Sequence, residues 1–208
     1  MIIDVMKSRR SVRRFKPDRP PREAIERLLE AAVTAPSASN KQPWRFLVVT
    51  RRSTIEALAA AVREATDRIA RHVEPAFEAS FRAYGDYFTR FEGAPVVLAC
   101  LHRPLAVLSH LVGDRLPEED RDRIRVMEHD SGLMGVAMAI ENLLLAAHEM
   151  GLGASGMTGP LVASDRLRTL LEIPPSWNLA AFVPLGFPAE TPPPTDRKPA
   201  AQVATWIE

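Results

Sequence analysis

The sequence has almost no cysteine: Cys100 is the only one among 208 residues. A single thiol cannot form an internal disulfide, so packing rather than cross-linking has to hold the fold together. Such a chain suits a reducing compartment, and we expect a cytoplasmic protein. The length fits one domain with a sizeable core, so we interpret residues 1–208 as a single domain.

An excess of charge is also missing. The chain has 27 basic and 26 acidic residues, a formal net charge of +1, which argues against a general nucleic-acid binder. The longest apolar stretch, Leu133–Ala147, is interrupted by Glu141 and Asn142 and is too short to span a bilayer. Residues 1–14 have no apolar core of signal-peptide length. We therefore expect neither a nucleic-acid nor a membrane partner.

Most familiar catalytic motifs are absent too. There is no G-x-S-x-G nucleophile elbow, and no histidine pair has metal-ligand spacing such as H-E-x-x-H. Gly151–Gly156 matches the dinucleotide fingerprint G-x-G-x-x-G, but that fingerprint requires a strand before it and a helix after it. Here a predicted helix precedes it and Met157–Pro160 follows. We interpret His148 and Cys100 as packing residues.

The hydrophobic pattern predicts a mixed α+β architecture. Buried strands are predicted at 45–50, 93–101 and 179–185. Helices are predicted at 2–8, 21–35, 130–150 and 164–173, and a further one of about five turns starts from a capping box formed by Ser53 and Glu56. The segment after Phe187 is rich in proline and should form an extended arm.

Three polar segments could bind a ligand. Residues 9–14 (RRSVRR) place four guanidinium groups beside a hydroxyl, a good cradle for phosphate, although an exposed basic turn has the same pattern. Residues 36–44 (PSASNKQPW) form a rigid polar loop that could read the edge of a heterocycle or simply end a helix. Residues 151–160 contain four glycines, which allow backbone N–H groups to approach a ligand or merely cap a helix.

In their order and spacing these segments resemble the FMN-dependent nitroreductase family. The same is true of N-L-L-L-A-A-H-x-x-G-L-G at 142–153, and of L-G-F-P at 185–188 with Asp196–Pro199 beyond it. The resemblance covers nearly the whole chain and is loosest at 51–130. It implies a nitroreductase-like fold, with a central mixed β-sheet flanked by helices and a C-terminal arm exchanged in a homodimer that holds FMN at its interface.

The resemblance also implies roles for individual residues. Arg9, Arg10 and Ser11 would hold the flavin phosphate together with Arg197 from the arm, and Arg13 would lie near the N1–C2=O edge of the ring. The residues that would line the isoalloxazine are Pro36, Ser37, Ala38 and Asn40, with Gln42 from the partner chain. The backbone around Gly156, Met157 and Thr158 would face N5, and no catalytic side chain or metal is implied.

Three observations bear on dimerisation and on the substrate. The small residues Gly132, Gly135 and Ala139 on one face of the predicted 130–150 helix would let a second chain approach closely. Many relatives have a bulky residue where this chain has Gly156, so we expect a wider site or a looser backbone near N5 and a different range of acceptors. The aromatic residues of the variable segment are predicted to pack in the core rather than line the pocket: Phe81, Tyr84, Phe88 and Phe91.

We therefore expect a ping-pong oxidoreductase in which NADH or NADPH reduces FMN, and a nitroaromatic, quinone or related acceptor is reduced from the same face. One alternative is a family member that fragments its flavin or dehalogenates its substrate. Another is a non-catalytic flavin-binding regulatory module. The sequence contains no feature that selects the donor or names the acceptor.

Overall fold

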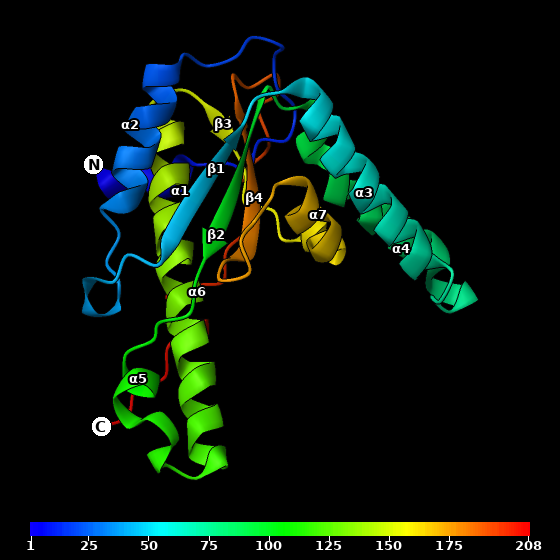
Figure 1. Ribbon diagram of the computed structural model, residues 1–208. Helices are drawn as coiled ribbons and strands as arrows, with labels where there is room; N and C mark the ends of the chain where they lie inside the picture. Colours follow the sequence, from blue (N-terminus) through cyan, green and yellow to red (C-terminus); the bar gives the residue numbers. More distant parts are fainter.

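A computed structural model describes all 208 residues (Figure 1). Four strands form one sheet in the order β1–β2–β4–β3. Their bounds are β1 Trp44–Val49, β2 Val96–His102, β3 Gly153–Ala154 and β4 Asn178–Gly186.

Every pairing in this sheet is antiparallel. The α+β class is confirmed, but the mixed sheet is not formed within the chain. The reason lies in the connections, because Val49 at the end of β1 pairs with Val97 and His102 at the end of β2 pairs with Asn178. Each long connection thus returns to the end of the sheet that it left, and this direction cannot be read from hydrophobicity.

Helices α1 (Ile2–Ser8), α2 (Arg22–Val33) and α6 (Glu118–Glu149) lie on one side of the sheet (Figure 1). On this side Val96, Leu98 and Cys100 of β2 are fully buried, because successive side chains of a strand point to opposite faces. The predicted helix from Pro21 is confirmed. Its residues Ile25, Leu28 and Ala32 are buried in this core.

The other side of the sheet carries α3 (Arg52–Ala70), α4 (Glu78–Gly85) and α7 (Ser164–Leu170) (Figure 1). Two 3₁₀ helices, η3 (Asp86–Gly93) and η5 (Gly159–Ala163), join them in a second core. In this core the ring of Phe91 meets that of Phe182 of β4 edge to face, with 5.1 Å between centroids. The remaining short elements are η1 (Ala38–Asn40), η2 (Pro75–Phe77), α5 (Leu108–Val112), η4 (Gly113–Arg115) and η6 (Ala200–Gln202).

Helix α3 has the predicted length but not the predicted start. It begins at Arg52, so Ser53 lies inside the first turn and makes no capping hydrogen bond. Glu56, which the capping box would use, instead pairs with Arg52 at 2.9 Å. The arginine competes successfully for this carboxylate because residues four apart face each other on a helix.

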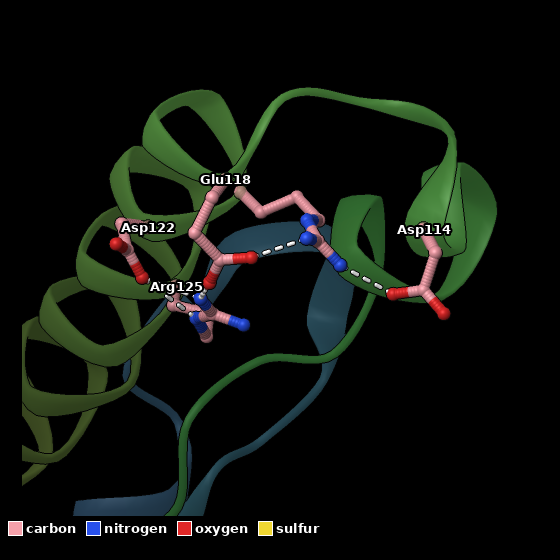
Figure 2. A network of polar contacts seen from close by, with 5 residues as sticks. Asp114, Glu118, Asp122 and Arg125 are labelled. Atoms are coloured by element: carbon pink, nitrogen blue, oxygen red, sulfur yellow. Dashed lines mark hydrogen bonds and ion pairs between the residues drawn. The ribbon is translucent and has the colours of Figure 1, made fainter.

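Helix α6 is longer than the helix predicted at 130–150, because the charged residues that precede this range are also helical. There Arg121 pairs with both Asp114 and Glu118, and Arg125 pairs with Glu118 and Asp122 (Figure 2). By length and composition alone α6 could cross a membrane, and half of its apolar window is buried inside this chain.

The small residues of α6 are used within the chain, which corrects their predicted role in dimerisation. A Cβ atom at Gly132 would overlap the carbonyl oxygen of Arg103, and one at Gly135 would lie 3.0 Å from Cγ of Pro43. Ala139 is completely buried in the core. This face of α6 is therefore unavailable to a second chain.

The aromatic residues of the variable segment divide into two groups. Phe88 and Phe91 are buried, as predicted, whereas Tyr84 is exposed and Phe81 is half-buried. The prediction failed for Tyr84 because the helix breaks at Gly85 into η3, so that residues before and after the break do not share one face.

The arm leaves the body of the protein after Glu190. Residues 193–208 are all exposed, and their backbone hydrogen bonds are confined to the single turn around η6. Trp206 and Ile207 are 86% and 96% exposed. The arm is thus extended, as predicted, and residues 193–208 are not packed into a groove of their own chain.

Candidate functional site

The arginine-rich turn lies directly against strand β3. The N–H of Val12 donates to the carbonyl of Ala154 at 3.1 Å, and the Val12 side chain is buried. A Cβ atom at Gly153 would lie 2.6 Å from Cγ1 of Val12, so glycine is required for this approach. The turn and the glycine-rich loop, two of the three predicted ligand-binding segments, are therefore adjacent.

Two guanidinium groups of the turn, those of Arg10 and Arg13, have no carboxylate partner. The Arg10 guanidinium donates only to the carbonyls of Lys7 and Arg9, both at 2.8 Å, and the Arg13 guanidinium donates to that of Ser11 at 3.3 Å. Arg9 is 4.0 Å from a carboxylate oxygen of Glu141 on α6. Unpaired guanidinium groups beside a hydroxyl are suited to a phosphate.

Glu190, at the base of the arm, fixes the shape of this turn. Its carboxylate accepts hydrogen bonds from the N–H groups of Arg13 at 2.7 Å and Arg14 at 3.1 Å, and it pairs with the Arg14 side chain. Because the acid binds backbone, it leaves the Arg13 side chain free. The sequence contains no pattern that links residues 176 positions apart, so this support was missed.

The loop after β3 offers backbone donors next to the turn. Met157 is not among them, because its N–H donates to Phe182 at 2.8 Å and its side chain lies in the core. The N–H groups of Gly156 and Thr158, on either side of it, have no partner in the chain. The expectation for Met157 is corrected in this respect, while Gly156 and Thr158 are exposed and available.

The space beside Gly156 is open. A Cβ atom there would meet only Cδ1 of Leu144 at 4.0 Å, which is ordinary contact. The preceding residue, Ser155, is fully buried with a hydroxyl that has no hydrogen-bond partner. The loop thus leaves free space beside Gly156 and contains a buried polar group that the fold leaves unpaired, which calls for an explanation in a native structure.

The polar loop at 36–43 is strained. Ser39, Asn40 and Gln42 have φ angles of 51°, 52° and 45°, in the left-handed region that favours glycine. The Ser37 hydroxyl accepts from the N–H of Gln42 at 2.9 Å and so helps to hold this shape. Ala38 and Asn40 belong to η1 and are exposed, as is Pro36. Strain of this kind concentrates where a binding site requires it.

Helix α6 separates this loop from the other two segments. Gly135 of α6 lies 3.8 Å, measured from an added Cβ atom, from Cβ of Ser37, whereas Leu144 meets the loop at Gly156. Nine residues of α-helix turn the side chain through about 180° and advance it by about 13 Å. In Figure 1 the loop before β1 projects beyond the lower end of that strand. The chain therefore does not bring its Ser37–Gln42 side chains to its own arginine turn.

Arg197 also stands apart. Its guanidinium donates only to Thr195 and Asp196 within the arm, at 2.7 and 3.2 Å. It is exposed and touches none of the other predicted site residues. Within one chain, Arg197 therefore does not lie near Arg9 as expected for a shared phosphate site.

Titratable groups outside these segments have structural surroundings. Burial raises the pKa of the Cys100 thiol well above its usual range, so the thiol is not reactive. Burial, with a smaller contribution from His129, lowers the pKa of His102 to about 4. His148 is hydrogen-bonded to Ser8 at 2.8 Å, but it is half-buried rather than part of the core. No cluster of three His, Cys, Asp or Glu residues could hold a metal ion.

The family model described as "Nitroreductase family" matches residues 6–187. The chain belongs to this family. Its relatives include an NADH dehydrogenase from Thermus thermophilus, 32% identical, with 95% of this chain and 92% of the relative covered. A 5,6-dimethylbenzimidazole synthase from Rhodospirillum rubrum is 31% identical, with 89% and 81% covered. An iodotyrosine deiodinase from Thermotoga neapolitana is 29% identical, with 93% and 91% covered.

Solved structures agree with the family. A BluB-like flavoprotein from Clostridium difficile 630 has a TM-score of 0.86 and 27% identity, and the match covers 100% of this chain and 99% of that one. An iodotyrosine deiodinase bound to FMN and 3-iodo-L-tyrosine has a TM-score of 0.73 and 25% identity, with 96% of each chain covered. The nitroreductase-like fold is thus confirmed.

Proposed function

We propose that this protein is an FMN-dependent oxidoreductase that takes electrons from NADH or NADPH and delivers them to a nitroaromatic, quinone or related acceptor. The observation that carries the proposal is the uncompensated charge of Arg10 and Arg13 beside the free N–H groups of Gly156 and Thr158. The FMN present in a solved relative, iodotyrosine deiodinase, supports the choice of cofactor.

The residues fit an FMN molecule in charge and in space. The phosphate carries about −1.5 to −2 charges and matches guanidinium groups bidentately. Arg9, Arg10 and Ser11 would hold it, and the exposed backbone at Gly156 would leave room for a planar ring. Bound FMN would supply a two-electron carrier, accepting hydride from the nicotinamide and passing both electrons to the acceptor.

The chain's own groups would bind and orient. Arg13, held in place through its backbone by Glu190, would put a fixed positive charge at the pyrimidine edge of the ring. That charge would stabilise negative charge on the reduced cofactor and raise its potential. The N–H groups of Gly156 and Thr158 would fix the ring's central edge. No side chain in this site is needed to move a proton.

An anaerobic visible spectrum of the purified protein tests the proposal. We expect flavin bands that bleach on addition of NADPH or NADH and return when an acceptor such as a quinone is added. Steady-state lines should be parallel, because donor and acceptor would share one face. If the bands persist with both donors, the non-catalytic binding module is the better account, and if FMN does not bind at all, the site itself is wrongly assigned.

We also propose that the site is completed in a homodimer. The Ser37–Gln42 loop and the Arg9–Arg13 turn lie across α6 from each other in one chain, so a second copy would have to supply the missing half. Helix α6 exposes an apolar strip that is distinct from its small-residue face, formed by Val126, Met127, Leu133 and Met134. The free arm, with Trp206 and Arg197, would cross to the partner.

Light scattering at several protein concentrations tests the dimer. We expect twice the chain mass, and loss of both dimer and flavin when residues 191–208 are deleted. A monomer that retains flavin would exclude the interface site.

A second candidate is specialised chemistry of the same flavin. The similarity to a 5,6-dimethylbenzimidazole synthase and to an iodotyrosine deiodinase favours it. Mass spectrometry of the flavin after aerobic reduction would detect fragmentation, and halide release from 3-iodotyrosine would detect dehalogenation. Intact flavin together with absence of halide release would exclude both.

A further inference from the structure

The segment formed by α4 and η3 is attached to the candidate flavin site at two points. The ring of Phe88 fills the space that a side chain at Gly159 would need, immediately after the Gly156–Thr158 loop. The ring of Tyr87, the next residue along, lies 5.9 Å from the guanidinium carbon of Arg13. Tyr87 is therefore held at the rim of the site rather than placed at random on the surface.

Tyr87 lies between two guanidinium groups. Arg90 stacks on its ring, with the guanidinium carbon 3.7 Å from the ring centroid, and Arg13 approaches the same ring. Tyr87 is 44% exposed, so one part of the side chain remains open to a ligand. An arginine held flat on an aromatic ring keeps its N–H donors directed outwards at the ring edge.

No acidic residue of this region forms an ion pair with Arg90 or with the side chain of Arg13. Glu92 pairs with Arg63 at 2.7 Å, which lowers the pKa of Glu92. Glu190 is bound to the backbone of the arginine turn. Asp86, in the first turn of η3, pairs with no cation. Arg90 and the side chain of Arg13 thus carry positive charge that no carboxylate of the chain neutralises.

We propose that Tyr87 and Arg90 form a recognition site for an anionic group carried by an aromatic substrate whose reacting end reaches the flavin. The proposal rests on the proposed function and specifies the substrate of that same site. The anionic group is a carboxylate or phosphate, bound by the Arg90 N–H donors, while an adjacent planar ring packs on the open part of Tyr87. Its source is either the acceptor itself or the ribose phosphate of NADPH.

The primary experiment compares two acceptors that differ in charge. Calorimetry on the purified full chain measures binding of 4-nitrobenzoate and of the neutral 4-nitrobenzamide. For Arg90→Gln we expect the dissociation constant for 4-nitrobenzoate to rise by about three- to tenfold, with little change for the amide. Arg71→Gln, which removes the same charge from an exposed site without a partner, should affect neither.

Variants of Tyr87 test the stacking. Tyr87→Phe should bind 4-nitrobenzoate as the parent does, because the ring is kept, whereas Tyr87→Leu should weaken binding of both nitroaromatics. In turnover, Arg90→Gln should raise KM for 4-nitrobenzoate and leave kcat unchanged. Equal effects of Arg90→Gln on the acid and the amide would overturn a carboxylate site.

The donor arm separates the two sources of the anion. If Arg90→Gln slows flavin reduction by NADPH at low concentration but not by NADH, the phosphate of the donor occupies the site. If neither the acid nor NADPH is affected selectively, the anion site is absent. Failure of the parent protein to reduce any acceptor would instead reject the proposed function, and the binding ratios would still decide the anion site.

Discussion

The ring of Phe88 lies in the space that a side chain on Gly159 would need, so that η3 and the start of η5 can pack together only with glycine at this position. This contact joins the variable segment to the loop that faces the candidate flavin site.

Substitution of Gly159 by alanine should therefore destabilise the protein by about 1–3 kcal/mol, the usual cost of overpacking a core. Gly156→Ala is the matched control, since its Cβ atom would meet only Leu144 at 4.0 Å, and its free energy of unfolding should change by less than about 0.5 kcal/mol. Urea unfolding of both variants measures the difference. If Gly159→Ala lost no more stability than Gly156→Ala, the Phe88 ring would be able to move aside without cost.

Arg10 provides a test of phosphate binding. Arg10→Gln removes a guanidinium group that has only backbone partners, so folding should be little affected. Affinity for FMN should fall by about ten- to a hundredfold, the value of a charge-assisted hydrogen bond. Riboflavin, which lacks the phosphate, should bind the variant and the parent equally. A parallel loss for riboflavin would place Arg10 at the ring instead.

The strained backbone at Gln42 should lower stability, while the Gln42 side chain should contribute to FMN binding. Gln42 has a φ of 45°, and a left-handed residue other than glycine costs about 1–2 kcal/mol. Gln42→Gly should raise the free energy of unfolding by up to about 1 kcal/mol while it weakens FMN binding, because the side chain is lost. Gln42→Ala keeps the strain and should weaken binding without added stability. If Gln42→Ala also became more stable, relief of the backbone strain would not explain the gain in stability of Gln42→Gly.

The surroundings of Glu128 predict that the stability of the protein falls at acidic pH. Burial raises the pKa of its carboxyl, but hydrogen bonds from Ser109 and from the N–H groups of Val107 and Leu108 outweigh burial, and the folded pKa is lowered. A carboxyl with a lowered folded pKa stabilises the protein above its unfolded pKa of about 4.5, and this contribution is lost as the pH falls through the folded pKa. Glu128→Gln should be less stable at pH 7 and should lose less stability than the parent between pH 5 and pH 3.

The contribution of His102 to stability should change over a different pH range. Its folded pKa of about 4 lies below the ordinary value of 6.5, so the neutral imidazole is the form that the fold accommodates. Its contribution to stability is complete above pH 6.5 and declines as the pH falls towards 4. His102→Phe, compared with the exposed control His72→Phe, should flatten the melting temperature between pH 6.5 and pH 4.5. An unchanged pH profile would show that His102 does not carry this pH dependence.

Local pattern was enough to predict most elements of the fold. The apolar spacing from Ile25 to Ala32 and the run Val96–Cys100 each bury their side chains as periodicity requires. The direction of the strands and the hydrogen-bond partners of side chains were harder to predict. The antiparallel order follows from where long connections re-enter the sheet, and the start of α3 depends on whether Glu56 bonds to Ser53 or to Arg52. Local composition contains neither fact.

The candidate site was predictable in part for a similar reason. The arginine turn and the glycine loop could be recognised as segments, but their contact through Val12 and Ala154 is a matter of tertiary structure. The role of Tyr87 and Arg90 depends on Phe88 docking at Gly159, more than 70 residues away, and no sequence spacing reports it. The small residues of α6 led to a wrong prediction of a dimer contact. Small residues are needed wherever two backbones approach closely, whether within a chain or between chains, so their presence does not distinguish the two cases.

The position of α6 between the arginine turn and the Ser37–Gln42 loop has a genetic consequence. In a dimer of the proposed kind, one allele altered at Arg10 and another altered at Asn40 would each be inactive alone. A mixed dimer would combine both lesions in one site and leave the other site wholly native. Two null alleles expressed together should thus complement each other, restoring up to a quarter of the native activity if chains pair at random.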